Sequence, residues 1–167
     1  MRVAVTDANI FIDLIKLDLI AHLFGIGLEI FTTAEVLEEL NDRQVALLRQ
    51  FEQDGLLTVK VLTDEHRNAV TMLKVQAGLS YTDRSVIVLS EVLDALVLTG
   101  DRKVRKYCIA QQKEVRGIIW LFDCFLQFQC IDHAVAVEKM EGLMQINNRL
   151  PLEECLERLG RWRKSIP

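Results

Sequence analysis

Acidic side chains follow two apolar stretches that are typical of strands. Asp7 ends the segment "VAVTD", and Asp101 comes two residues after "ALVLT". The carboxyl ends of parallel strands meet at one edge of a sheet, where ligands of α/β domains bind, so we expect both carboxylates at that edge. Aspartate is also a favourable helix N-cap, and a purely capping role for each residue remains an alternative.

Two further acids lie on predicted helices. Asp83 begins a helix on a face that is otherwise apolar or small, where an ionised carboxylate needs a partner unless it only stabilises the first turn. In "AEVLEEL", helical geometry places Glu39 closest to the apolar stripe, whereas Glu35 and Glu38 point away. Glu39 is therefore the glutamate expected to face inward, although a fully solvated acidic face is the alternative.

The combination of Asp7, Glu39, Asp83 and Asp101 predicts a metal site. Several carboxylates in one pocket repel one another unless a cation neutralises them. Mg²⁺ and Mn²⁺ prefer oxygen ligands, and such an ion activates water and stabilises charge on a leaving oxygen. The three histidines are scattered along the chain, so a zinc site or a Ser/His/Asp triad has little support. The predicted chemistry is therefore hydrolysis of a phosphate ester.

The densest positive cluster of the chain directly follows Asp101. Arg102, Lys103, Arg105 and Lys106 begin a predicted helix and would offset the repulsion between a carboxylate site and a polyanion by contacting its phosphates. A solvated helix face is the alternative for each of them. The net charge of −4 and the pI near 5.4 argue against sequence-blind adhesion to nucleic acid but not against a local site.

The elements that must position these residues alternate between strand and helix. Strands are predicted at 3–5, 28–33, 56–62, 95–99 and 114–117, and helices at 9–24, 33–42, 43–55, 63–78, 81–94, 101–113, 118–129, 133–145 and 151–164. Thr33 and Thr63 are expected helix N-caps, and Gly55 an expected C-cap. This alternation predicts an α/β domain with a parallel sheet of four or five strands and helices on both faces.

Length and composition indicate an ordinary globular protein of the cytoplasm. The 167 residues suffice for one domain with a real core. No apolar run reaches the ~20 residues of a membrane span, and the N-terminus lacks a signal-peptide pattern. The four cysteines have no CxxC spacing. They are interpreted as reduced core residues, with zinc ligands or disulfides as the alternative.

At these acids the sequence resembles the PIN-domain nucleases. In that family an Asp ends the first strand with Asn or Ser two residues later, as in "TDAN" with Asp7 and Asn9. A "T/S-x5-E-L" segment follows, as in "TAEVLEEL" with Glu39, and then "L-x3-D", as in "LSYTD" with Asp83. A final "T-x-D" is matched by Thr99 and Asp101. Each motif alone is weak, but four in order are fairly specific.

The resemblance implies a three-layer fold and a nuclease activity. It implies Mg²⁺ or Mn²⁺ at the four acids, pocket-shaping roles for Asn9 and Thr99, and hydrolysis of RNA. We expect a PIN-like domain over residues 1–130 and a C-terminal helical extension over 131–167 packed on the same domain. Many small relatives resemble VapC-type toxins that an antitoxin holds in check, and many dimerise. An antitoxin and a second copy of the chain are therefore candidate partners beside RNA, with no membrane partner expected.

Two other functions remain as alternatives. A PIN scaffold that has lost catalysis would serve as a protein- or RNA-binding module, since fold does not guarantee activity. A phosphatase of the haloacid-dehalogenase type also places an Asp after its first strand but requires a second Asp at the position of Asn9. The presence of all four acids favours the nuclease.

Overall fold

The computed structural model describes residues 2–73 and 78–166, and in this part of the chain five parallel strands form one sheet. The strands are β1 (Arg2–Thr6), β2 (Leu28–Thr33), β3 (Leu57–Lys60), β4 (Leu96–Leu98) and β5 (Val115–Arg116). Their order across the sheet is β3-β2-β1-β4-β5. The predicted α/β fold with a parallel sheet is confirmed, including its short fifth strand.

The strand order reverses beside β1. The chain moves from β1 to β2 and β3, then returns to place β4 on the other side of β1, where Thr6 pairs with Leu98. Crossover connections diverge at this point, which is where ligands bind in open α/β sheets. The sequence places Asp7 directly after β1 and Asp101 shortly after β4, so both follow the strands that border the reversal.

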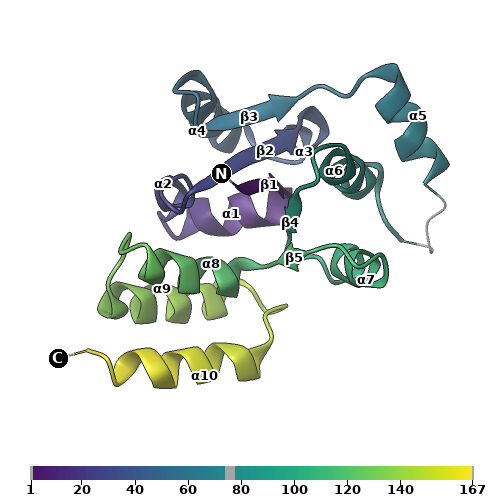
Figure 1. Ribbon diagram of the computed structural model, residues 1–167. Coiled ribbons are helices and arrows are strands. Elements are labelled where there is room, and N and C mark those ends of the chain that lie inside the picture. Colours follow the sequence, from purple (N-terminus) through teal and green to yellow (C-terminus); the bar gives the residue numbers. More distant parts are fainter. Residues whose placement is uncertain (1, 74–77, 167) are drawn as a thin grey trace.

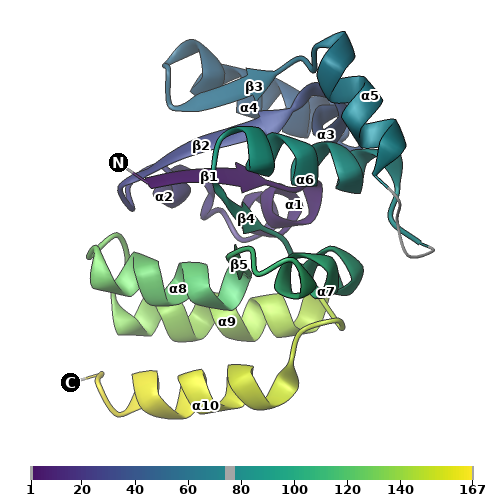
Figure 2. The same ribbon diagram turned by 45° about the vertical axis from the view of Figure 1, so that its right-hand side comes forward.

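Helices cover both faces of the sheet. They are α1 (Ala8–Lys16), α2 (Ile20–Leu23), α3 (Ala34–Glu38), α4 (Asp42–Gln53), α5 (Asp64–Met72), α6 (Tyr81–Val92), α7 (Arg102–Ala110), α8 (Ile118–Gln127), α9 (His133–Ile146) and α10 (Leu152–Arg163). In Figure 2, α6 crosses in front of β1 and β2, whereas α1, α2 and α4 lie behind the sheet. All residues of α6 from Ser85 to Ser90 are buried, so this stretch of the helix is covered on every side.

Local signals for helix ends are largely correct. Thr33 and Thr63 cap α3 and α5, and Gly55 follows α4 in the left-handed conformation with φ of 72°. The helix predicted over 9–24 is instead two helices. Asp18 has φ of 57°, which ends α1, and the chain turns before α2 begins. The helix predicted over 63–78 ends at Met72, and its stretch at 74–77 lies outside the described residues.

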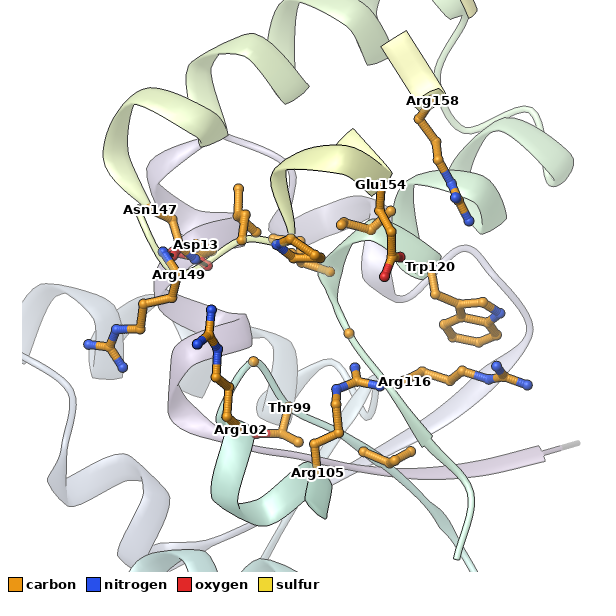
Figure 3. Close-up of a pocket in the computed structure, with 17 residues that line it drawn as sticks. Asp13, Thr99, Arg102, Arg105, Arg116, Trp120, Asn147, Arg149, Glu154 and Arg158 are labelled. Carbon is orange, nitrogen blue, oxygen red and sulfur yellow. Dashed lines mark hydrogen bonds between the residues drawn. The ribbon is translucent and has the colours of Figure 1, made fainter. Parts of the chain in front are cut away.

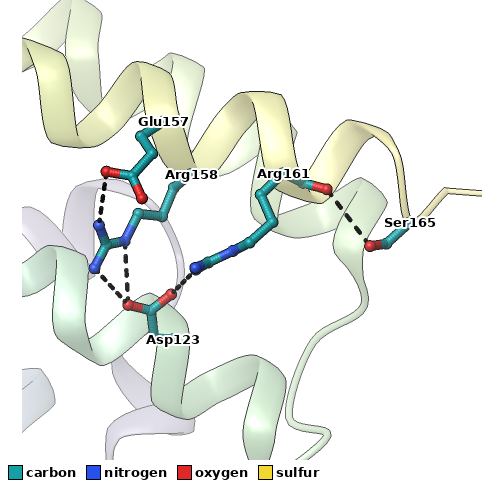
Figure 4. A network of polar contacts seen from close by, with 5 residues as sticks. All are labelled: Asp123, Glu157, Arg158, Arg161 and Ser165. Carbon is teal, nitrogen blue, oxygen red and sulfur yellow. Dashed lines mark hydrogen bonds and ion pairs between the residues drawn. The ribbon is translucent and has the colours of Figure 1, made fainter.

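The three C-terminal helices stack in succession beside the β5 end of the sheet (Figure 1). Their buried side chains join the same apolar core as the strands, with Phe122 of α8 stacked on Trp162 of α10 at 5.9 Å between ring centroids. Arg158 and Arg161 of α10 both donate to Asp123 of α8, at 3.1 and 3.0 Å (Figure 4). These contacts fix α10 against α8.

Two further observations concern membrane-spanning helices and the cysteines. Among residues 2–73 and 78–166, no helix combines the length and apolar character needed to cross a membrane. Cys108, Cys124, Cys130 and Cys155 are all free, and burial raises the pKa of the Cys108 and Cys124 thiols to about 11. Buried thiols with such a high pKa are poor nucleophiles and poor metal ligands.

Candidate active site at the carboxyl ends of the strands

Asp7 lies at the centre of the hydrogen-bond network at the end of β1. Its side chain is 3 % exposed. Oδ1 accepts a hydrogen bond from the Ala8 backbone N–H at 2.8 Å, which caps α1. Oδ2 accepts from Asn9 Nδ2 at 2.6 Å and from Thr99 Oγ1 at 2.8 Å. The carboxylate is therefore both a cap and the link between β1 and the end of β4.

The turn between β4 and α7 is attached to Asp7 through Asn9 and Thr99. Gly100 N–H donates to Asn9 Oδ1 at 2.6 Å, and Asp101 N–H donates to Thr99 Oγ1 at 3.0 Å. A Cβ on Gly100 would lie 3.1 Å from Asn9 Oδ1, so the close approach of this backbone favours glycine. Asn9 and Thr99 hold two carboxylate-bearing turns in one arrangement.

Asp101 is the N-cap of α7. Its Oδ1 accepts from the backbone N–H groups of Lys103 and Val104, at 2.7 and 3.0 Å. Asp101 therefore has the capping role that the sequence left open as an alternative. The cap uses Oδ1, and the carboxylate is only partly buried. A cap of this kind is compatible with a second role for the same side chain.

Asp83 also has a structural role. It is the third residue of α6, and Asp83 Oδ2 accepts from the Ser80 N–H at 2.7 Å while Ser80 Oγ accepts from the Asp83 N–H at 3.0 Å. This reciprocal pair is a capping box, which sequence inspection missed because the acid is Asp rather than the usual Glu. The pair fixes the first turn of α6 and with it the direction of Asp83.

Glu39 lies at the end of a short helix. Helix α3 ends at Glu38, so Glu39 is its C-cap and is exposed. Helical phase was a poor guide here because the helix stops before Glu39. Contrary to the prediction, Glu35 is half-buried, and its Oε2 is fully buried without a hydrogen-bond partner among the described residues.

A buried hydroxyl pair fixes α3 relative to α6. Thr33 Oγ1 and Ser85 Oγ lie 2.9 Å apart, and both residues are fully buried. Thr33 is also the N-cap of α3, and Ser85 lies two positions after Asp83. Helix α6, which carries Asp83, is therefore joined by a buried polar contact to the start of α3, the helix that Glu39 follows.

The electrostatics of Asp7 indicate a shared negative region. Burial raises the pKa of Asp7 from 3.8 to about 6, against the opposing hydrogen bonds from Thr99 and Ala8. The negative charges of Asp83 and Glu39 are smaller causes of the same rise. Three of the four predicted acids are thus close enough to interact through space, and the fourth joins Asp7 through Thr99.

The acids are nevertheless not packed into a ready coordination sphere. Within residues 2–73 and 78–166, no group of three or more Asp, Glu, His or Cys side chains is close enough to hold one metal ion. Mg²⁺ commonly retains several water ligands and uses only one or two carboxylates directly. The donor chemistry, oxygen ligands around a desolvated carboxylate, therefore fits a hard divalent cation, although the described residues form no closed cage.

Comparison with known proteins decides the family. A family model described as a PIN domain matches residues 3–164. The chain belongs to the PIN-domain family. The match covers both the sheet and the C-terminal helices, and PIN domains are generally nucleases, which assigns the chain to the hydrolases at a coarse level. The comparison with curated proteins gives no match.

The four cations that follow Asp101 in this PIN domain point to two different sides of α7. Arg102 and Arg105 face a cavity on the side of the β4–α7 turn toward the C-terminal helices (Figure 3). Lys103 instead donates from Nζ to the Gly78 carbonyl oxygen at 3.1 Å, and Lys106 is exposed. The sequence analysis predicted the same role for all four cations, but helical geometry places them on different sides of α7.

Proposed function

We propose that this PIN domain is a divalent-metal-dependent endoribonuclease that hydrolyses phosphodiester bonds of RNA. The observation that carries the proposal is Asp7, a nearly fully buried carboxylate at the strand reversal with a raised pKa and two acidic neighbours in electrostatic range. A buried carboxylate of this kind lowers the stability of the fold, which favours a functional role for it. Its position at the strand reversal is also where α/β domains bind ligands.

Asp7, Glu39, Asp83 and Asp101 would hold Mg²⁺ or Mn²⁺. When bound, the ion would supply positive charge against the charge that develops on the phosphate and would lower the pKa of a water molecule. The protein groups have separate tasks. Asn9 and Thr99 keep the Asp7 carboxylate oriented and ionised by donating to Oδ2, and the burial of Asp7 excludes bulk water.

Cations beside the acids would receive the flanking phosphates. Arg102, Lys103, Arg105 and Lys106 are proposed to contact the RNA backbone rather than the reacting atoms. Because they occupy the first turn and a half of α7, whose N-terminus also carries a partial positive charge, they would attract a strand that the carboxylates repel.

Cleavage of labelled single-stranded RNA tests the proposal most directly. Purified protein should cut in Mn²⁺ or Mg²⁺ and be inactive in EDTA, and Asp7→Asn should lower the rate at least about 100-fold. The melting temperature of the wild type should rise on addition of Mn²⁺, and this rise should shrink in the variant. Equal cleavage by both proteins would mean that a contaminating nuclease or another site is responsible.

The catalytically inactive scaffold is the second candidate. Two observations favour it: three of the acids cap helices, and no closed group of ligands exists in the described chain. It predicts RNA or protein binding without any metal-induced shift in melting temperature. A toxin role, an antitoxin partner, dimerisation and a cytoplasmic location are finer proposals that rest on the family resemblance and the free cysteines.

A further inference from the structure

A cavity lies between the sheet and the C-terminal helices and is rich in arginine. We call it the arginine cavity. It has a volume of about 370 Å³, in the range of small-ligand pockets. Five arginines line it, Arg102 and Arg105 from α7, Arg116 from β5, Arg149 from the α9–α10 loop and Arg158 from α10. Asp13 and Glu154 are the only carboxylates among its described lining residues.

Three of these arginines are available for an anion. Arg158 is paired with Asp123, and Arg116 with Glu114. Arg102, Arg105 and Arg149 have no carboxylate within 4.0 Å in the part of the chain that the structure describes. Guanidinium groups that line one cavity without a carboxylate at ion-pair distance favour a phosphate, which accepts two parallel hydrogen bonds from one arginine.

The loop that carries Arg149 is anchored. Asn147 Nδ2 donates to Asp13 Oδ2 at 2.7 Å, and Asn147 Oδ1 accepts from the Arg149 N–H at 3.0 Å. One amide thus ties the α9–α10 loop to α1 and fixes the backbone of Arg149. Figure 3 shows that Arg102 and Arg105 extend from α7, whereas Arg149 extends from the loop before α10. The positive groups therefore come from parts of the chain that are distant in sequence.

The remaining walls suit a ribose and a base. Apolar side chains from the start of α8 and from the loop before α10 line the cavity, namely Ile118, Ile119, Leu150 and Pro151. Trp120 stands at its rim with the Arg116 guanidinium over its ring at 5.8 Å from the centroid. Stacking on aromatic rings and guanidinium planes is a common way to bind an unpaired base.

The arginine cavity and the acids share one wall. Thr99 and Gly100 line the cavity, while Thr99 Oγ1 donates to Asp7 and Gly100 N–H donates to Asn9. Provided that the proposed function holds, we propose that the cavity binds one nucleotide of the RNA strand, next to the phosphate that is cut. The C-terminal helices of this PIN domain then form part of the substrate path rather than a support for the fold alone.

Binding in EDTA to a non-cleavable 2′-O-methyl single strand of roughly six nucleotides tests this inference without catalysis. Arg149→Ala is the variant, because Arg149 is exposed and its loss should not affect folding. Arg43→Ala, on the exposed face of α4, is the matched control for the change in charge. Arg149→Ala should weaken binding about tenfold and lower the salt slope by about 0.7, as for one lost contact to a single strand.

The control variant should bind like the wild type. Equal affinities of the Arg149→Ala and Arg43→Ala proteins would overturn the inference. A nucleoside 5′-monophosphate and inorganic phosphate form the second arm. If the cavity binds one nucleotide of a longer strand, both compounds should compete only weakly with the oligonucleotide. A monophosphate that binds as tightly as the oligonucleotide would indicate a site for free nucleotides and would also overturn the inference.

The two proposals fail in different ways. Arg149-dependent binding in EDTA without any cleavage in Mn²⁺ would remove the nuclease function and keep the nucleotide site. Metal-dependent cleavage that is equally fast in the Arg149→Ala and Arg43→Ala variants, together with equal binding, would keep the nuclease and remove the site. Both measurements use the whole chain of 167 residues.

Discussion

The acids around Asp7 and the arginine cavity lie on two sides of the same turn, yet they are built differently. Asp7, Asn9, Thr99 and Asp101 are held by the ends of two adjacent strands and by short-range hydrogen bonds. The arginine cavity is assembled from α7, β5 and the C-terminal helices. The first depends on local sequence around a sheet edge, and the second depends on tertiary packing.

This difference in construction suggests that the acids around Asp7 carry out the chemistry and that the arginine cavity binds the substrate. Residues near the strand ends can be placed with little freedom, because parallel strands fix their positions. The arginines of the cavity come instead from helices and loops whose positions depend on packing between distant parts of the chain. We expect changes near Asp7 to alter rate and changes in the arginine cavity to alter affinity.

Asp83→Asn and Asp101→Asn should have the largest effects. Asn serves as well as Asp in these caps, so the hydrogen bonds from Ser80 N–H and Lys103 N–H survive and only the negative charge is lost. If the charges bind metal, cleavage should fall at least about 100-fold with little change in the unfolding midpoint. Asp132→Asn, at the N-cap of α9, is the control with the same chemistry away from the site. Unchanged cleavage in all three would reduce Asp83 and Asp101 to caps.

The pH dependence of stability should reveal the buried charge of Asp7. Its pKa rises on folding from 3.8 to about 6, equivalent to about 3 kcal/mol. A raised carboxyl pKa contributes stability that is present below pH 4 and is lost as the pH rises through about 6. The unfolding free energy of the wild type should therefore fall relative to Asp7→Asn between pH 4 and pH 8.

The comparison must use the change with pH rather than the offset at one pH. In Asp7→Asn, an amide NH₂ placed at Oδ2 would face the donors of Asn9 and Thr99, which costs stability at every pH. Urea unfolding of both proteins at several pH values without metal gives the difference. A difference that stays constant from pH 4 to pH 8 would contradict the raised pKa.

Thr99→Val should have a smaller effect on stability. Valine keeps the shape but removes the donor to Asp7 Oδ2 and the acceptor for Asp101 N–H, at a fully buried position. We expect a loss of about 1–3 kcal/mol in the free energy of unfolding, measured in urea at pH 7. Thr71→Val on the exposed face of α5 is the control, since its hydroxyl only donates to a backbone carbonyl. Equal losses would mean that the Thr99 network does not matter.

The sequence predicted the part of the molecule that local rules determine. The strand ends, the caps at Thr33 and Thr63, and the adjacency of β1 and β4 follow from short patterns and from the rules for parallel sheets. The break at Asp18 was missed because a left-handed residue other than glycine leaves no clear signal. The prediction that Glu39 faces inward was wrong because α3 ends before this residue.

The arginine cavity could not be predicted in this way. Nothing in the spacing of Arg116 and Arg149 along the sequence indicates that they line one cavity with Arg105. Arg116 is placed by the pairing of β5 with β4, and Arg149 by the hydrogen bond from Asn147 to Asp13, a contact between residues 134 positions apart. Only the positive charge of the segment after Asp101 is evident from the sequence, and the structure divides its four cations between the cavity and the opposite side of α7.

Gly117→Ala should have the smallest effect and gives the finest test of the arginine cavity. Gly117 is the N-cap of α8 in an extended conformation that alanine adopts freely, with φ of −126°. An added Cβ would lie 2.8 Å from Arg105 Nη2 and 3.4 Å from the Thr99 carbonyl oxygen. The flexible guanidinium can move, so we expect a stability loss of at most about 1 kcal/mol and a loss of oligonucleotide affinity of about two- to threefold.

A double-mutant cycle distinguishes displacement of Arg105 from a general disturbance. In an Arg105→Ala background, Gly117→Ala should no longer weaken binding of the 2′-O-methyl strand, because no guanidinium remains to be displaced. Gly160→Ala, where an added Cβ meets nothing within 4 Å, is the matched control and should leave binding unchanged. The same loss with and without Arg105 would show that the start of α8 acts on binding independently of that arginine. The assignment of Arg105 to the nucleotide phosphate would then be wrong, while the role of Arg149 would stand on its own measurement.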